Sequence, residues 1–218
     1  MNKVNAASTD SLEILENVEA VAVEKIRGAR LVGNVQNILN VFDTATARQI
    51  ADGASWYDVA HAAAMDIGDG NLNMGAGMLA ALSPRKEWTL NVIAAYEVKL
   101  HGNKAKGMLP DSRKKAVAIR DGASVMSEIG KRKDTGKKVR AFYEAIRNPR
   151  AIFATAVIDR HAVSVWVGET QTDKQLEKLQ LKGQYETIAT AYAEAASLRN
   201  VTVHTMQAVT WVTWRESK

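Results

Sequence analysis

The stretch SEIGKRKDTGKKVRAFYEAI, residues 127–146, decides how this chain folds. Basic side chains gather around two glycines, Gly130 and Gly136, in a way that no other part of the sequence repeats. Directly afterwards Val139, Phe142 and Ile146 recur at the i, i+3, i+7 spacing that lines one face of a helix. The stretch therefore predicts a helix, a glycine-flanked basic hairpin and a second helix.

Such a hairpin has a physical use. Glycines let the backbone approach an anion closely, the amides at a helix N-terminus point outward, and lysines supply countercharge. We expect the following residues to contact nucleic-acid phosphates: Lys131, Arg132, Lys133, Gly136, Lys137 and Arg140. The alternative is a solvated loop that happens to be rich in lysine.

Charge along the chain is uneven. Residues 99–150 carry 15 Lys and Arg against 5 Asp and Glu, whereas the counts are 7 against 12 before this segment and 7 against 7 after it. Charge concentrated in this way is expected for a protein that binds phosphate backbones, because each neutralised phosphate releases counterions. A basic surface that only keeps the protein soluble remains the alternative.

Helix is the expected structure elsewhere. Alanine is abundant, there are three prolines, and no stretch sustains the period-two alternation of a strand. The pattern predicts a loop over 68–77. The expected helices are residues 12–26, 35–42, one beginning at Ser55 with a Ser55–Asp58 capping pair, 78–83, 88–101, 113–120 and 125–129.

The stretch ATAVIDRHAVSVWVG, residues 154–168, places one acid at a helix start. An apolar run ends at Asp159, and helical spacing resumes with Ala162, Val163 and Trp166. Asp159 therefore stands at an N-cap position, where a carboxylate accepts hydrogen bonds from first-turn amides. A cap needs no further function, and that interpretation stays open.

Three segments in this order resemble the helix-hairpin-helix DNA glycosylase superfamily, in a divergent form similar to bacteriophage proteins. They are ALSPRKEWTLNV (81–92), SEIGKRKDTGKKVRAFYEAI (127–146) and VIDRHAVSVWVG (157–168). The terminal QAVTWVTWR (207–215) is similar to the ending of the phage-type relatives.

The resemblance implies an all-α, two-lobed helical bundle with a DNA cleft between the lobes. The whole chain, 1–218, would form a single helical unit. The helix-hairpin-helix and the aspartate would occupy about 113–168, and the N- and C-terminal helices the second lobe. The family turns a nucleotide out of the duplex into a pocket. By this resemblance Asp159 would stabilise the sugar cation as the base leaves, and Lys138 would be the amine nucleophile of a bifunctional enzyme.

The chain departs from the family in two respects. Its hairpin is longer and more charged than the usual hydrophobic-Pro-Gly-hydrophobic-Gly core, and it lacks that proline. Many members carry an iron–sulfur cluster, whereas this chain has no cysteine. We therefore expect the fold of the family to be retained, whereas the reaction can differ.

Other polar and aromatic residues are weaker candidates. Arg85 would border the DNA because the matching family segment faces it. His161 follows Asp159 by two positions, and Trp211 and Trp214 lie on one face of the last predicted helix with His204 and Gln207. His161, Trp211 and Trp214 could line a base pocket, or simply belong to the core.

Composition excludes several classes of protein. Without cysteine there are no disulfides or thiolate metal sites, and the four histidines show no ligand spacing, so we expect neither metal nor cofactor. No apolar run is long enough for a signal peptide or a membrane span. We expect a cytoplasmic protein, in the host cell if it is viral; its oligomeric state stays open.

The sequence thus favours a protein that binds double-stranded DNA and cleaves the N-glycosidic bond of a flipped base. Three alternatives remain: a non-catalytic DNA-binding module, a phage effector with an acidic protein partner, and an enzyme that modifies a hypermodified base without releasing it.

Overall fold

A computed structural model describes residues 33–130, 136–152, 154–172 and 183–217. Residues 33–218 form one compact unit by their contacts, and residues 1–32 lie outside the described residues. The predicted helix over 12–26 and the cations Lys131, Arg132 and Lys133 fall outside them as well.

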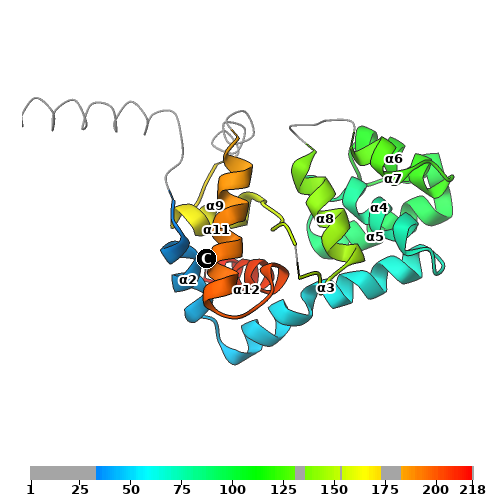
Figure 1. Cartoon of the computed structure of the whole chain (residues 1–218). Helices are drawn as coiled ribbons and strands as arrows, with labels where there is room; N and C mark the ends of the chain where they lie inside the picture. Colours follow the sequence, from blue (N-terminus) through cyan, green and yellow to red (C-terminus); the bar gives the residue numbers. More distant parts are fainter. Residues whose placement is uncertain (1–32, 131–135, 153, 173–182, 218) are drawn as a thin grey trace, which may run out of the picture. The chain divides into compact units, whose positions relative to one another are not determined.

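All regular structure in the described residues is helical, as the sequence predicts (Figure 1). The elements are α2 (Val35–Asp43), α3 (Ala47–Ile67), α4 (Leu72–Leu82), α5 (Trp88–His101), the 3-10 helix η1 (Gly102–Lys104), α6 (Pro110–Arg120), α7 (Val125–Ile129), α8 (Lys137–Arg147), α9 (Arg160–Val167), α11 (Gln184–Leu198) and α12 (Val203–Glu216).

The helices of this unit contact one another in two groups (Figure 1). One group contains α2, α9, α11 and α12, and the other contains α4 to α8. The long helix α3 joins them, because it packs on α12 in the first group and on α4, α5 and α8 in the second. Side chains of α3 therefore lie between the two groups of helices.

Three predicted boundaries are wrong, one of which is the start of α6, at Pro110 instead of Arg113. The third helix begins at Ala47, eight residues before Ser55, because Thr46 and Gln49 form the capping box there. The predicted loop over 68–77 is also too long, since α4 begins at Leu72 and its glycines are buried. A Cβ atom at Gly75 would lie 1.9 Å from the backbone oxygen of Ala64, so this glycine lets α4 approach α3 closely.

Candidate functional site

A pocket of about 570 Å³, which includes space open to solvent, lies where the two groups of helices and α3 meet. The lining residues come from α3, the turn before α5, α5, α8, the segment before α9, and α12. They are Trp56, Tyr57, Ser83, Lys86, Trp88, Asn91, Lys138, Phe142, Val157, Asp159, Gln207, Ala208 and Trp211.

Aromatic rings form much of the wall. The ring of Trp56 lies 5.1 Å from that of Trp88, 5.9 Å from that of Trp211 and 6.0 Å from that of Phe142, centroid to centroid. The rings are tilted or edge-on to one another, the arrangement that aromatic pairs favour. A planar heteroaromatic ligand would therefore meet π-faces and ring edges on several sides.

Asp159 is both a helix cap and a residue of the pocket. Its Oδ1 accepts a hydrogen bond from the Ala162 amide at 2.8 Å, which is the cap that the sequence predicts. Its Oδ2 lies 3.3 Å from Nδ1 of His161, and 18% of the side chain remains exposed. The carboxylate is thus fixed by two partners while it still lines the pocket.

The surroundings of Asp159 favour its ionised form. Burial by itself would raise the pKa of this carboxyl, but the hydrogen bond from His161, the positive charge of Lys138 and the Ala162 amide outweigh burial. The pKa of Asp159 therefore lies below its usual range. A negative charge persists in the pocket at neutral pH.

Lys138 and Asp159 meet at this pocket, although they belong to different elements. Lys138 lies in the first turn of α8, and Asp159 directly precedes α9. Lys138 is near enough for its charge to lower the pKa of Asp159, yet no ion pair within 4 Å joins these two described side chains. A ligand that enters the pocket therefore meets two cations, Lys86 and Lys138, and one anion, Asp159.

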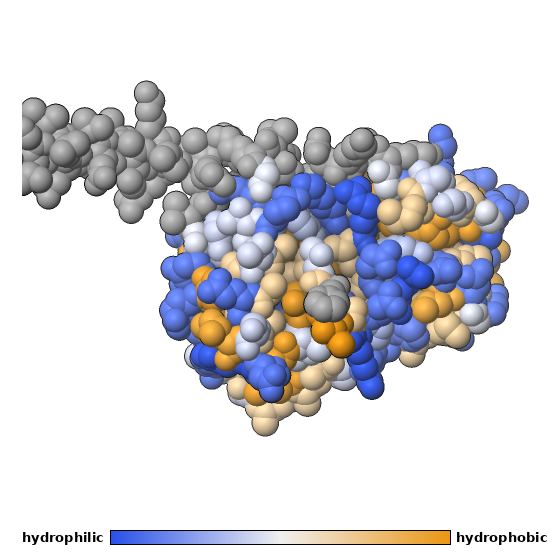
Figure 2. All heavy atoms as spheres, in the orientation of Figure 1, coloured by the Kyte–Doolittle hydropathy of each residue, from blue (hydrophilic) through white to orange (hydrophobic). Residues whose placement is uncertain are grey.

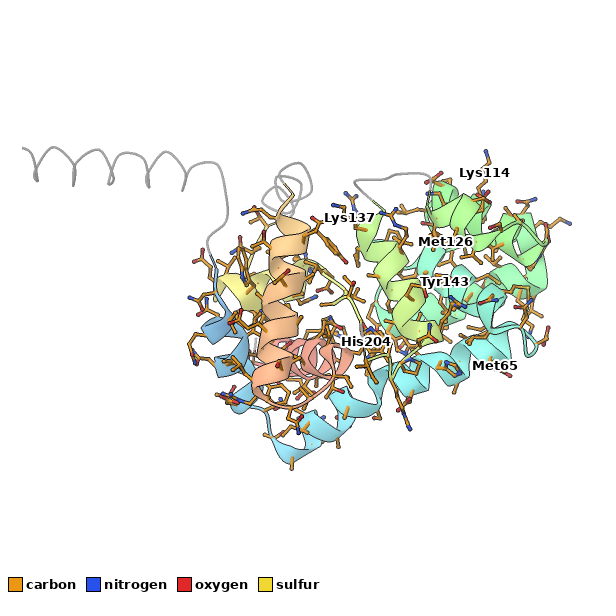
Figure 3. All side chains as sticks on the ribbon, in the orientation of Figure 1. Met65, Lys114, Met126, Lys137, Tyr143 and His204 are labelled. Atoms are coloured by element: carbon orange, nitrogen blue, oxygen red, sulfur yellow. The ribbon has the colours of Figure 1, made fainter. Side chains whose placement is uncertain are left out.

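The basic residues that follow Gly136 do not share one surface. Lys137 forms an ion pair with Glu186 of α11, and Lys137 and Arg140 line a second hollow between α8 and α11 with Glu144 and Glu186. Figure 2 shows that the outward surface of α8 is mostly hydrophilic, with apolar atoms in the hollow beside it. Figure 3 shows Lys137 at the N-terminal end of α8. Two of the cations that the sequence assigns to phosphate binding, Lys137 and Arg140, thus lie in the same hollow as the acidic residues Glu144 and Glu186.

The remaining predicted residues fall into three environments. His161 does not line the pocket, but it contacts Asp159 and its ring lies 6.1 Å from that of Trp211, which does. Trp214 is 9% exposed and lies outside the lining. Arg85 is exposed on the turn between α4 and α5, with a left-handed φ of 57° that costs a residue other than glycine about 1 kcal/mol.

The sequence does not single out the polar residues that α3 and α5 bring to the pocket, Tyr57 and Asn91, whereas Gln207 of α12 lies on the helix face that the sequence associates with a base pocket. The Tyr57 hydroxyl donates to Oε1 of Gln207 at 2.7 Å. Burial, together with the charge of Asp159, raises the pKa of this hydroxyl, so it keeps its proton. Asn91 lies on α5 and is 2% exposed. No sequence signal marks Tyr57 or Asn91, because what they share is a pocket built from distant segments of the chain.

Tyr185 positions the segment that leads to Asp159. Its hydroxyl donates to the Ala156 carbonyl at 3.2 Å and accepts from the Ile158 amide at 3.3 Å. We expect Tyr185→Phe to lower the free energy of unfolding by about 1 kcal/mol and to speed hydrogen exchange at the Ile158 amide. Tyr96→Phe, which removes a hydroxyl that donates to Asp66 far from this segment, should leave exchange at the Ile158 amide unchanged. Unchanged exchange at Ile158 would contradict the positioning role.

Comparisons with known proteins give one match. A family model described as "Family of unknown function (DUF7178)" matches residues 20–218. No curated protein and no solved structure matches the chain. Among the residues described, no helix is long and apolar enough to cross a membrane.

Proposed function

The chain belongs to the DUF7178 family of unknown function, and we propose that it is a DNA glycosylase-like enzyme that releases a base from double-stranded DNA. One observation carries this proposal: Lys138 and Asp159 line the same aromatic pocket. A pocket of this kind suits a base turned out of the duplex, because aromatic side chains stack on the π-face of any base.

The proposed reaction breaks the C1′–N bond of the flipped nucleotide. The electron pair leaves with the base, which gains a proton, and positive charge develops on the sugar. The Asp159 carboxylate, held ionised by its neighbours, stabilises that charge as a fixed anion in a partly water-excluded site. Water then forms the new bond at C1′ and loses one proton, which balances the proton taken up by the base, and an abasic site remains. In a bifunctional enzyme the Lys138 amine forms this bond instead.

Contacts with the DNA backbone are proposed at the start of α8 and on the turn before α5. Gly136 is the N-cap of α8 and contributes no side-chain cap, so the first amides of the helix are available to a phosphate oxygen. Lys138 in the first turn adds countercharge, and Arg85 extends from the turn whose neighbours Ser83 and Lys86 line the pocket. The helix-hairpin-helix glycosylase bundle is the fold type that this arrangement favours.

A non-catalytic DNA-binding module is the second candidate. Both carboxylate oxygens of Asp159 already have partners, Ala162 and His161, as in a structural cap. Such a module would use the same pocket to hold an extruded base and would leave the C1′–N bond intact.

The direct test is release of a base. The protein is incubated with duplexes that carry damaged or phage-type modified bases, and abasic sites are detected by alkaline strand cleavage. We expect abasic sites in at least one duplex. Tight binding across the panel without any abasic site would contradict the enzyme and favour the binding module.

Lys138 is expected to contribute to DNA binding by its charge. Lys138→Ala should weaken duplex binding to a similar extent across sequences and reduce the slope of log affinity against log salt by about 1. Lys114→Ala is the matched control, since Lys114 is exposed on α6 and does not line the pocket (Figure 3). Titrations at several salt concentrations provide the measurement; equal slopes for wild type and Lys138→Ala would contradict the contact. Borohydride trapping of a covalent complex in wild type distinguishes the amine route from the water route.

A further inference from the structure

The pocket contains a buried hydrogen-bond acceptor without a donor. Three buried side-chain atoms among the described residues lack a partner, namely Oδ1 of Asn91, Nε of Arg147 and Oε1 of Gln171. Of the three, Asn91 lines the pocket that holds Asp159. A buried acceptor without a partner has lost its hydrogen bonds to water and gained none in return, so it suits a ligand that supplies the missing donor.

The orientation of the Asn91 amide follows from its one protein partner. Nδ2 of Asn91 donates to the backbone oxygen of Leu79 at 3.0 Å, and a carbonyl can only accept. The reverse orientation would place two acceptors against each other. Oδ1 is therefore the atom of Asn91 that is left for a ligand, and it acts as an acceptor.

Gln207 complements this acceptor with a donor. Its Oε1 accepts from the Tyr57 hydroxyl, so its Nε2 is the amide atom left to donate. Gln207 is 5% exposed and lines the same pocket as Asn91. The lining of this pocket thus contains one amide with an unpartnered acceptor and one amide with a remaining donor.

We propose that Asn91 is the specificity-determining residue of the pocket, and that it selects a base with an exocyclic amino group. This inference rests on the proposed function and deepens it by naming the substrate class. The amino N–H donates to Oδ1 of Asn91, and the neighbouring ring nitrogen accepts from Nε2 of Gln207. The edge of adenine, one donor beside one acceptor, matches the two amides with no group left over. A thymine or uracil edge presents acceptor, donor and acceptor, and needs a further donor.

The test uses free rings, so that it does not depend on DNA binding or on base release. The probes are 9-methyladenine, its 6-dimethylamino analogue, which has no N–H, and 1-methylthymine. Tryptophan fluorescence reports binding, because three of the five tryptophans of the chain, Trp56, Trp88 and Trp211, line the pocket. We expect 9-methyladenine to bind about 10-fold more tightly than either other ring, the effect of one hydrogen bond to a buried group.

Two variants complete the experiment. Asn91→Leu should bind the two purines equally, whereas Gln171→Leu, which removes an unpartnered amide oxygen outside the pocket lining, should keep the wild-type preference. Far-UV circular dichroism checks that each variant folds, and the wild-type comparison of the two purines stands even where a variant does not. Equal binding of the two purines by wild type, no binding of any ring, or a preference that survives Asn91→Leu would each overturn the proposal. The wild type could prefer 9-methyladenine and yet produce no abasic site in any duplex. That result would contradict the proposed reaction but support the role of Asn91.

Discussion

Asp159→Asn is expected to abolish base release while the protein stays folded. Asparagine caps a helix about as well as aspartate, so the hydrogen bond from the Ala162 amide is kept, and the protein should stay folded although it loses the stabilisation of the ionised carboxylate. The negative charge that stabilises the sugar cation is lost, and removal of a fixed electrostatic stabiliser costs about 10²–10³-fold in rate. Single-turnover kinetics on a duplex that the wild type cleaves provides the measurement.

The control for this variant is Asp121→Asn, which neutralises an exposed carboxylate at the C-terminal end of α6. It should retain wild-type kinetics. Asp159→Asn should also bind the duplex at least as tightly as wild type, because it removes an anion that repels phosphate. Undiminished base release by Asp159→Asn would remove this residue from the mechanism.

The lowered pKa of Asp159 fixes the direction of its pH dependence. A carboxyl whose pKa is lower in the folded than in the unfolded protein stabilises the fold above the unfolded value of about 3.9, and this contribution disappears as the pH falls through the folded value. The reaction should therefore keep its Asp159-dependent rate through mildly acidic pH. Loss of that rate between pH 5 and 7, with the fold intact, would contradict an ionised Asp159.

Gly53→Ala is expected to destabilise the fold. Gly53 lies on α3, and a Cβ atom there would lie 2.5 Å from Cα of Val209 and 2.6 Å from its nitrogen, both backbone atoms of α12. Rotamer changes cannot relieve a clash with backbone, so the two helices must separate. Overpacking of this kind costs about 1–3 kcal/mol, more than the roughly 1 kcal/mol that alanine adds to helix propensity.

The consequences of Gly53→Ala should extend to the pocket. The Tyr57–Gln207 hydrogen bond and the Trp56–Trp211 contact both join α3 to α12 and both line the pocket. We expect a lower midpoint of urea unfolding and weaker binding of 9-methyladenine. Ser55→Ala, on the exposed part of α3, should change the free energy of unfolding and the free energy of binding by no more than about 0.5 kcal/mol each. A Gly53→Ala protein as stable as wild type would contradict the close packing of α3 on α12.

The local patterns of the sequence predicted much of the fold. The apolar spacing located α2, α5, α7 and α8, and the position of Asp159 before a helical pattern identified the cap of α9. These features depend on neighbours within one or two turns, which a sequence displays directly. The sequence did not predict the start of α4. Gly75 lowers the helix propensity of this segment, and the residue that it packs against, Ala64, belongs to another helix.

The candidate site was only partly predictable for the same reason. Asp159 and Lys138 stand out by their places beside a helix start, and a family resemblance associates them. Of the aromatic wall the sequence marks Trp211, but it does not show that Trp56, Trp88 and Trp211, from three different helices, meet in the folded chain. The unpartnered oxygen of Asn91 is likewise visible only once its surroundings are known.

The most direct test of the account is a crystal structure of the Asp159→Asn protein bound to a duplex that the wild type cleaves. We expect one nucleotide to be turned out of the DNA duplex. Its base should lie among Trp56, Trp88 and Trp211, and its C1′ atom should lie beside residue 159. A duplex with every base stacked, or bound to a face away from this pocket, would contradict the account.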